Sequence, residues 1–168
     1  MAQITKNSIL FIGFANEYCQ TLESAANLEK EEFVDKMLKL LPRLYISIAD
    51  FSPESIDDSI YIDAFLDEIY YDSIRRNLEM VLGEDDTFLE AFEEDMKFSD
   101  TPIAASVSEY LADIFQHLYD FIHAVKDAPE EQINNCLNIC KENFEMYWGQ
   151  TLCNVLRALH RIKYNNLY

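Results

Sequence analysis

Apolar residues recur at the spacing of an α-helix over most of the chain. The first such segment covers 5–26, and its part from Ile9 to Phe14 is apolar nearly all round, which predicts a central, well-covered helix. The second covers 29–51, with apolar residues at i, i+4, i+7 and i+8. Pro42 lies within it, and because a proline removes one helical hydrogen bond and clashes with the preceding turn, we expect a kink there.

The middle of the chain is less regular. Residues 52–66 mix Asp, Ser, Ile and Tyr without a period, which predicts a mobile loop. A helix over 67–82 follows, and Gly83 stands just beyond it, where glycine readily adopts a positive φ. The acidic run Glu84-Asp85-Asp86 then precedes 87–94, which we expect to form a short capped helix.

The C-terminal part predicts two long helices. Ser99-Asp100-Thr101-Pro102 places a capping threonine before a proline at the first helical position, so we expect a helix from Pro102 to about Lys126. Asp127-x-x-Glu130 has the spacing of a capping box and predicts that the last helix begins almost at once, antiparallel to the one before. That helix keeps one apolar phase as far as Ile162, and Gly149 within it is expected to allow close approach of another backbone.

Together these elements predict an all-α fold, a single-domain antiparallel bundle of five or six helices with a long C-terminal helix, covering 1–168. The 168 residues suit one domain with a sizeable core. Three glycines and four prolines are few for a β-rich fold, which needs frequent tight turns.

The acidic charge of the chain is concentrated in its middle. The net charge is −18, and residues 50–100 carry seventeen acidic residues against three basic ones. Direct nucleic-acid binding is therefore disfavoured, because its affinity comes largely from Lys and Arg that neutralise phosphates. Anionic membrane surfaces are disfavoured for the same reason. A basic protein partner, a divalent cation or simple solubility stay open.

The sequence carries no sign of a membrane span, and we expect a cytoplasmic protein without cofactors. No run of eighteen apolar residues occurs. The apolar run Ile9–Ala15 loosely imitates a signal peptide, but the helical period continues past it through Leu22 and Ala25, and no small-x-small cleavage site stands out. The cysteines form no C-x-x-C pair, and we expect them to be small buried apolar residues. They are Cys19, Cys136, Cys140 and Cys153.

One acidic stripe is the best candidate for chemistry. Glu109, Asp113, His117 and Asp120 fall within about 80° of one helix face at 100° per residue. Carboxylates and an imidazole one turn apart can share a metal, as in helical di-iron sites. The opposite face of the same helix is apolar, however, so a solvated face explains the stripe equally simply and is the interpretation we favour. The second Glu-x-x-His pair of a di-iron site is absent from the chain.

Other catalytic patterns are incomplete. The window from Asp57 to Glu68 has the length of an EF-hand calcium loop, but Ile62 stands where that loop needs glycine. Glu31-Glu32-x-x-Asp35 imitates half of the magnesium site of all-α nucleotide pyrophosphohydrolases, whose second half has no counterpart at the right spacing. The histidines have no Ser or Cys partner in a recognisable motif, and His160 is expected to be packed.

Aromatic residues are abundant, and most lie on the apolar stripes of the predicted helices. Five tyrosines are harder to place inside the bundle, and we expect some of them to form a partner-binding surface, where tyrosine is enriched. They are Tyr61, Tyr70, Tyr71, Tyr164 and Tyr168.

Several short segments have a distinctive order and spacing: Leu82-Gly83-Glu84-Asp85-Asp86, Ser99-Asp100-Thr101-Pro102-Ile103-Ala104-Ala105-Ser106, Leu111-Ala112-Asp113-Ile114, Tyr147-Trp148-Gly149 and Leu156-Arg157-Ala158-Leu159-His160. Together they resemble a bacterial family of uncharacterised all-helical proteins, described only as a domain of unknown function. The resemblance covers most of the chain and is strongest over 78–162. It implies a small, cofactor-free cytosolic protein. Tyr110 and His117 stand where that family has acidic residues, which weakens a metal site on this face.

These observations favour a non-enzymatic protein-interaction module with a partner of basic surface. The alternative is a metal-dependent hydrolase that uses Glu109, Asp113, His117 and Asp120. If the chain has a functional surface, we expect it at the seam between the acidic segment 50–100 and the helix that begins at Pro102.

Overall fold

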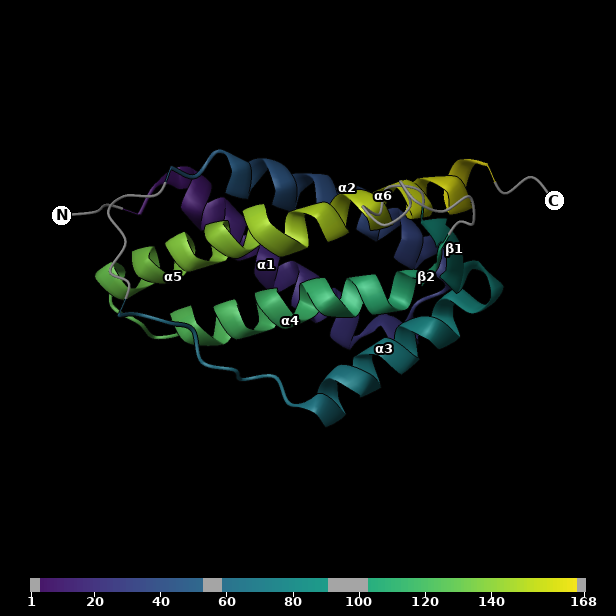
Figure 1. The fold of residues 1–168 in the computed structure, drawn as a ribbon, viewed down its shortest axis with the longest axis horizontal. Helices are drawn as coiled ribbons and strands as arrows, with labels where there is room; N and C mark the ends of the chain where they lie inside the picture. The colour runs from purple at the N-terminus through teal and green to yellow at the C-terminus, as the bar shows by residue number, and fades with distance from the viewer. Residues whose placement is uncertain (1–3, 53–58, 91–102, 166–168) are drawn as a thin grey trace.

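The computed structural model describes residues 4–52, 59–90 and 103–165 (Figure 1). The long helices are α1 (Lys6–Glu23), α2 (Lys30–Ala49), α3 (Glu68–Leu82), α4 (Val107–Val125), α5 (Glu130–Asn143) and α6 (Gly149–Tyr164). Short turns follow α1 and α3, namely η1 (Ala25–Asn27) and η2 (Gly83–Asp86), and one π-helical turn, η4 (Phe144–Trp148), joins α5 to α6. Strands β1 (Thr87–Glu90) and β2 (Ile103–Ser106) pair antiparallel. The all-α prediction with a long C-terminal helix is confirmed.

Four helical segments pack in a ring around the core. α1 contacts α2, α2 contacts α6, α6 contacts α4, and α4 contacts α1. In Figure 1, α4 and the continuous α5–α6 helix run antiparallel in front of α1 and α2. α3 lies outside this ring, along the flank of α4 and against η1. The ring therefore holds the main core, and α3 is a helix added to its side.

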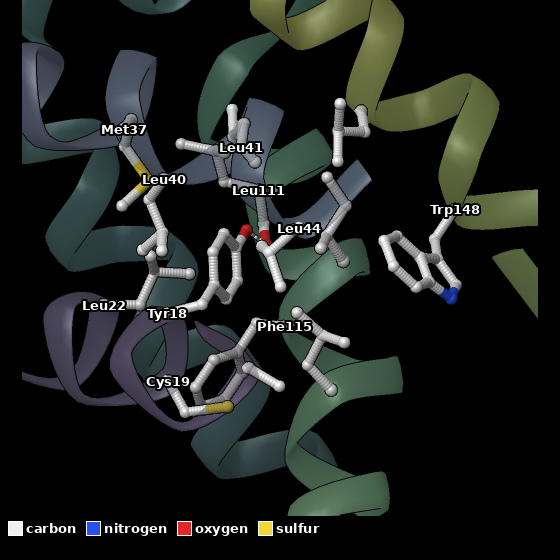
Figure 2. Close-up of a cluster of buried hydrophobic side chains, with 14 of the residues drawn as sticks. Tyr18, Cys19, Leu22, Met37, Leu40, Leu41, Leu44, Leu111, Phe115 and Trp148 are labelled. Carbon is white, nitrogen blue, oxygen red and sulfur yellow. Dashed lines mark hydrogen bonds between the residues drawn. The ribbon is translucent and has the colours of Figure 1, made fainter. Parts of the chain in front are cut away.

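The centre of the ring is rich in buried aromatic side chains. Tyr18 is fully buried, and its hydroxyl donates a 2.7 Å hydrogen bond to the backbone carbonyl of Leu111, which joins α1 to α4 (Figure 2). Phe11 stacks on Trp148 with ring centroids 6.2 Å apart. A buried tyrosine needs such a partner for its hydroxyl, because an unpaired polar group in a core is costly.

The predicted first helix is less covered than its composition suggests. α1 begins after Thr5, whose side chain accepts a hydrogen bond from the backbone N–H of Ser8. Phe11 and Ala15 are buried, but Ile9 and Leu10 are exposed. The expectation of a well-covered segment from Ile9 to Phe14 is therefore wrong for Ile9 and Leu10. α2 runs through Pro42 without interruption, and the kink stays a prediction.

The β-hairpin corrects two predicted helix boundaries. Residues 87–90 form β1 rather than the start of a helix, while 91–94 lie outside the described residues. α4 begins at Val107 after Ser106, not at Pro102, which also lies outside the described residues. Two side chains account for this start: that of Ser106 caps α4, and the carboxylate of Asp86, far earlier in the chain, accepts a 2.7 Å hydrogen bond from the Ser108 N–H. Two acceptors thus fix the helix start at that point.

The link into α5 contains no capping box. Asp127 adopts a positive φ of 59°, and Pro129 occupies the cap position without a side-chain bond. Glu130 instead accepts a 3.0 Å hydrogen bond from the backbone N–H of Ile4, which ties the start of the chain to α5. The predicted capping role of Asp127 is wrong because its backbone turns away from the extended conformation that a cap requires.

The last helix is continuous from Glu130 to Tyr164 but includes the π turn η4. The three nearest contacts at Gly149 come from the helix's own preceding turn and not, as was predicted, from another segment's backbone. A Cβ added there would lie 2.5 Å from the carbonyl oxygen of Phe144.

Candidate functional site

Two carboxylates of the α4 stripe attach α3 and its approach segment. The Tyr71 hydroxyl donates a 2.5 Å hydrogen bond to Oδ1 of Asp113. Oδ1 of Asp120 accepts bonds from the backbone N–H groups of Phe65 and Leu66, at 2.9 and 2.8 Å. Glu23 on α1 acts in the same way, because its Oε2 accepts a 2.5 Å hydrogen bond from the Tyr70 hydroxyl.

The electrostatics of these carboxylates follow from burial. Partial burial raises the pKa of Asp113, and the bond from Tyr71 partly counteracts that rise. Burial likewise raises the pKa of Asp120, and its two backbone donors oppose the rise. The pKa of the Tyr71 hydroxyl is raised, first by burial and then by its bond to Asp113. Asp113 and Asp120 thus accept hydrogen bonds from uncharged donors, and these bonds join α4 to α3 and to the segment before it.

The other two members of the stripe point elsewhere. Glu109 is exposed in the first turn of α4. The His117 ring lies parallel to the ring of Tyr147 on η4, with centroids 6.3 Å apart, and burial lowers its pKa. Within residues 4–52, 59–90 and 103–165, no group of three His, Cys, Asp or Glu side chains converges on a possible metal. The metal site stays a prediction, and the solvated-face interpretation fits Glu109 alone, because the other three are half-buried.

Of the five tyrosines considered for a partner-binding surface, two lie in a helix interface and two are exposed. Tyr70 and Tyr71 use their hydroxyls to bond Glu23 and Asp113, so they belong to the α3 interface and not to a free surface. Tyr61 and Tyr164 are exposed. Tyr168 lies outside the described residues.

The outward face of α3, which was not among the predicted sites, carries the two most exposed large apolar side chains of the described residues. The side chain of Ile69 is 84% exposed and that of Met80 is 81% exposed. Ser73 and Arg76 lie between them on the same face, over a shallow hollow of about 770 Å³. The opposite face of α3 buries Ile74, Leu78 and Leu82. The signal was present in the sequence, because Ile69 and Met80 fall out of phase with that inner stripe.

A second hollowed surface lies at the end of the bundle, where α2 begins and α6 ends. A hollow of about 560 Å³ separates the first turns of α2 from the last turns of α6, and another of about 400 Å³ separates β1 from α6. Asp85 and Ile162 line both hollows, which therefore adjoin. We call these two hollows the end groove.

The cysteines and His160 are divided between the core and the surface. Cys19, Cys136 and Cys140 are buried as expected, and burial raises the pKa of each thiol, whereas Cys153 is exposed. His160 is exposed beside the ring of Tyr164, so its predicted packed position is wrong.

Asp35, the last residue of the acidic motif at the start of α2, is engaged in ion pairs. It binds Lys163 and, at 2.9 Å, Lys39, and these hydrogen bonds lower its pKa to about 2. Glu31 and Glu32 of the same motif are exposed. Asp86, which was predicted only to lie in an acidic run before a capped helix, is a buried carboxylate.

No helix in the described parts of the chain is long and apolar enough to cross a membrane.

Comparison with known proteins identifies relatives but no activity. The crystal structure of protein BF1032 from Bacteroides fragilis is similar, with 36% sequence identity, a TM-score of 0.84 and 96% of each chain covered. No curated protein matches the sequence. The sequence matches the family described as Domain of unknown function (DUF5063) over residues 2–165. The chain therefore belongs to this family, as the resemblance of its short motifs implied.

Proposed function

We propose that this protein is a non-enzymatic protein-interaction module and that the outward face of α3 is its docking surface. The observation that carries the proposal is the exposure of Ile69 and Met80 at 84% and 81% on one helix face. Single exposed apolar residues are common on protein surfaces, but two large ones on one helix face that no other described element covers suit a partner that covers them. Ser73 between them is small enough to let such a partner approach the helix closely.

The charge around this face favours a basic partner. Asp63, Asp67 and Glu68 are exposed at and before the start of α3. The arginines of α3 are already paired with carboxylates of the same helix: Arg75 binds Asp72 at 2.9 Å and Glu79 at 3.0 Å, and Arg76 binds Asp72 at 2.8 Å. The surrounding field is therefore negative, and Lys or Arg residues at the rim of an apolar patch would complement it.

The proposal is tested by tagged capture from native lysate at low salt with matched variants. Ile69→Ser/Met80→Ser removes both exposed apolar side chains. Ile46→Ser/Met146→Ser makes the same changes at two positions that are each 61% exposed on α2 and η4. We expect one stoichiometric basic protein with the wild type and the control pair, its loss with the α3 pair, and its release by high salt. Recovery of no such protein, or equal recovery with both pairs, would refute the docking surface.

A metal-dependent hydrolase that uses Glu109, Asp113, His117 and Asp120 is the second candidate function. The observation in its favour is that three of these groups are half-buried with shifted pKa values, as catalytic groups often are. Against it, Asp113 and Asp120 already accept hydrogen bonds from Tyr71 and from backbone N–H groups. Calorimetric titration with magnesium, manganese and zinc separates the two functions. Binding tighter than millimolar that Asp113→Asn abolishes would support the hydrolase, and no such binding would remove it.

A further inference from the structure

The end groove has an apolar floor between two helix ends. Its apolar lining where the first turns of α2 face the last turns of α6 consists of Val34, which is buried, and Ile162, which is half-buried. Ala158 and Phe88 extend the apolar lining toward β1. A hollow of about 560 Å³ is large enough for one or two large side chains with their backbone.

Ion pairs that cross the groove hold its walls in place. Lys30 on α2 binds Asp85 on η2 at 2.8 Å, and Lys163 on α6 binds Asp35 on α2. These pairs use two of the cations in the groove for structure. The groove is therefore preformed, which lowers the entropic cost of binding a ligand there.

The charge left over after these pairs is negative on the α2 side. Glu31, Glu32 and Glu84 are exposed at the rim and have no cation within ion-pair distance among the residues that the structure describes. The pKa of Lys30 is raised, mainly by its hydrogen bond to Asp85 and additionally by Glu31 and Glu84, so the field at this rim stabilises positive charge.

We propose that the end groove is a second docking site, which takes a Lys- or Arg-bearing segment of a partner protein with an apolar side chain as its anchor. The apolar side chain lies over Val34 and Ile162, and the basic side chains meet Glu31, Glu32 and Glu84. This site is distinct from the outward face of α3 and does not depend on the function proposed for that face.

The test is an NMR titration of the full ¹⁵N-labelled chain at low salt with the end-blocked hexapeptide Lys-Lys-Leu-Phe-Lys-Lys. We expect saturable amide shifts concentrated in 30–35, 84–89 and 158–163, the segments that line the groove. The hexapeptide with Ser-Ser in place of Leu-Phe should bind markedly more weakly, because it lacks the anchor. Absence of saturable binding, shifts spread over all acidic segments, or equal affinity of the Ser-Ser peptide would each overturn the proposal.

A charge-matched pair of variants separates the groove from the general acidity of the chain. Glu31→Gln/Glu32→Gln/Glu84→Gln should weaken peptide binding by about three- to thirtyfold, because each exposed charge contributes modestly at low salt. Glu17→Gln/Glu131→Gln/Glu142→Gln removes the same charge from exposed positions outside the groove lining and should weaken binding much less. Equal loss in both triple variants would show that only the overall field attracts the peptide. The α3 variants should bind the hexapeptide as the wild type does, so the two docking sites can fail separately.

Discussion

A side chain at Gly149 should disrupt the π turn that joins α5 to α6. A Cβ there would lie 2.5 Å from the carbonyl oxygen of Phe144 and 2.9 Å from Cε2 of the same residue. That carbonyl accepts the hydrogen bond from the Gly149 N–H that closes the π turn. The Phe144 ring has little freedom to move, since it packs edge-on against Trp148 at 4.8 Å and Tyr45 at 4.9 Å.

The expected magnitude follows from two opposing terms. Replacing glycine by alanine inside a helix stabilises by about 1 kcal/mol. The steric overlap costs about 1–3 kcal/mol, as overpacking in a close-packed site does. Gly149→Ala should therefore be neutral to destabilising by about 2 kcal/mol. Gly13→Ala is the matched control in α1, because its Cβ would meet nothing within 4 Å, and it should stabilise by about 0.5–1 kcal/mol.

Urea unfolding followed by circular dichroism measures both variants against the wild type. The midpoint should rise for Gly13→Ala and fall or stay level for Gly149→Ala, with a difference of about 0.5–3 kcal/mol in unfolding free energy between the two variants. An equal rise in both midpoints would refute the reasoning, because the π turn would then accept a side chain at Gly149 without cost.

Three further outcomes can be checked on the same protein. Asp86→Ala should lower the free energy of unfolding by about 2–4 kcal/mol, because the Ser108 N–H and the Ser106 and Ser108 hydroxyls lose a charged acceptor. The control is Asp63→Ala at an exposed position, and an equal loss of stability for both variants in urea unfolding would contradict this role of Asp86. The pKa of Asp35 is lowered from 3.8 to about 2, so its ion pairs stabilise the fold above its unfolded pKa and lose that contribution as the pH falls toward the folded value. The gap in urea midpoint between wild type and Asp35→Asn should accordingly be full at neutral pH and narrow below pH 4, and a gap that widens in acid would contradict it. In the folded protein a thiol reagent should modify exposed Cys153 and spare the buried Cys19, Cys136 and Cys140. Mass spectrometry should therefore find one adduct per chain, and two or more adducts would show that the core opens.

The positions of the long helices could be predicted because their inward residues follow a helical period. The inner stripe of α3 through Ile74, Leu78 and Leu82 is visible in the sequence, and so is the glycine that follows it. Gly83 has a φ of 58°, as its place beyond the helix predicts. These signals are local, so they need no knowledge of neighbouring elements.

Helix ends and the hairpin were harder to predict, because distant partners decide them. Ser106 rather than Thr101 caps α4, and the carboxylate that supports this start, on Asp86, lies twenty residues earlier in the chain. Asp127 has the spacing of a capping residue, but the backbone there turns to a positive φ. A strand of only four residues, such as β1, is also too short for its pattern of apolar and polar residues to distinguish a strand from a helix.

The candidate sites show the same division. Helical spacing alone places Glu109, Asp113, His117 and Asp120 on one stripe of α4. The roles of Asp113 and Asp120 depend on α3 and the segment before it, because their hydrogen-bond donors are Tyr71 and the backbone of Phe65 and Leu66. The end groove could not be predicted, because α2, the continuous η2–β1 segment and α6 are far apart in sequence and meet only in the folded chain.

The sequence by itself determined the all-α class, the course of the main helices and the strong negative charge, because each depends on residue type and short-range period. Only the tertiary structure decided which carboxylates bond to α3 and which tyrosine hydroxyls donate hydrogen bonds to them. It also decided where exposed apolar side chains and carboxylates lie near one another on the surface. Those properties depend on which surfaces the other helices cover, and packing between distant segments sets that coverage.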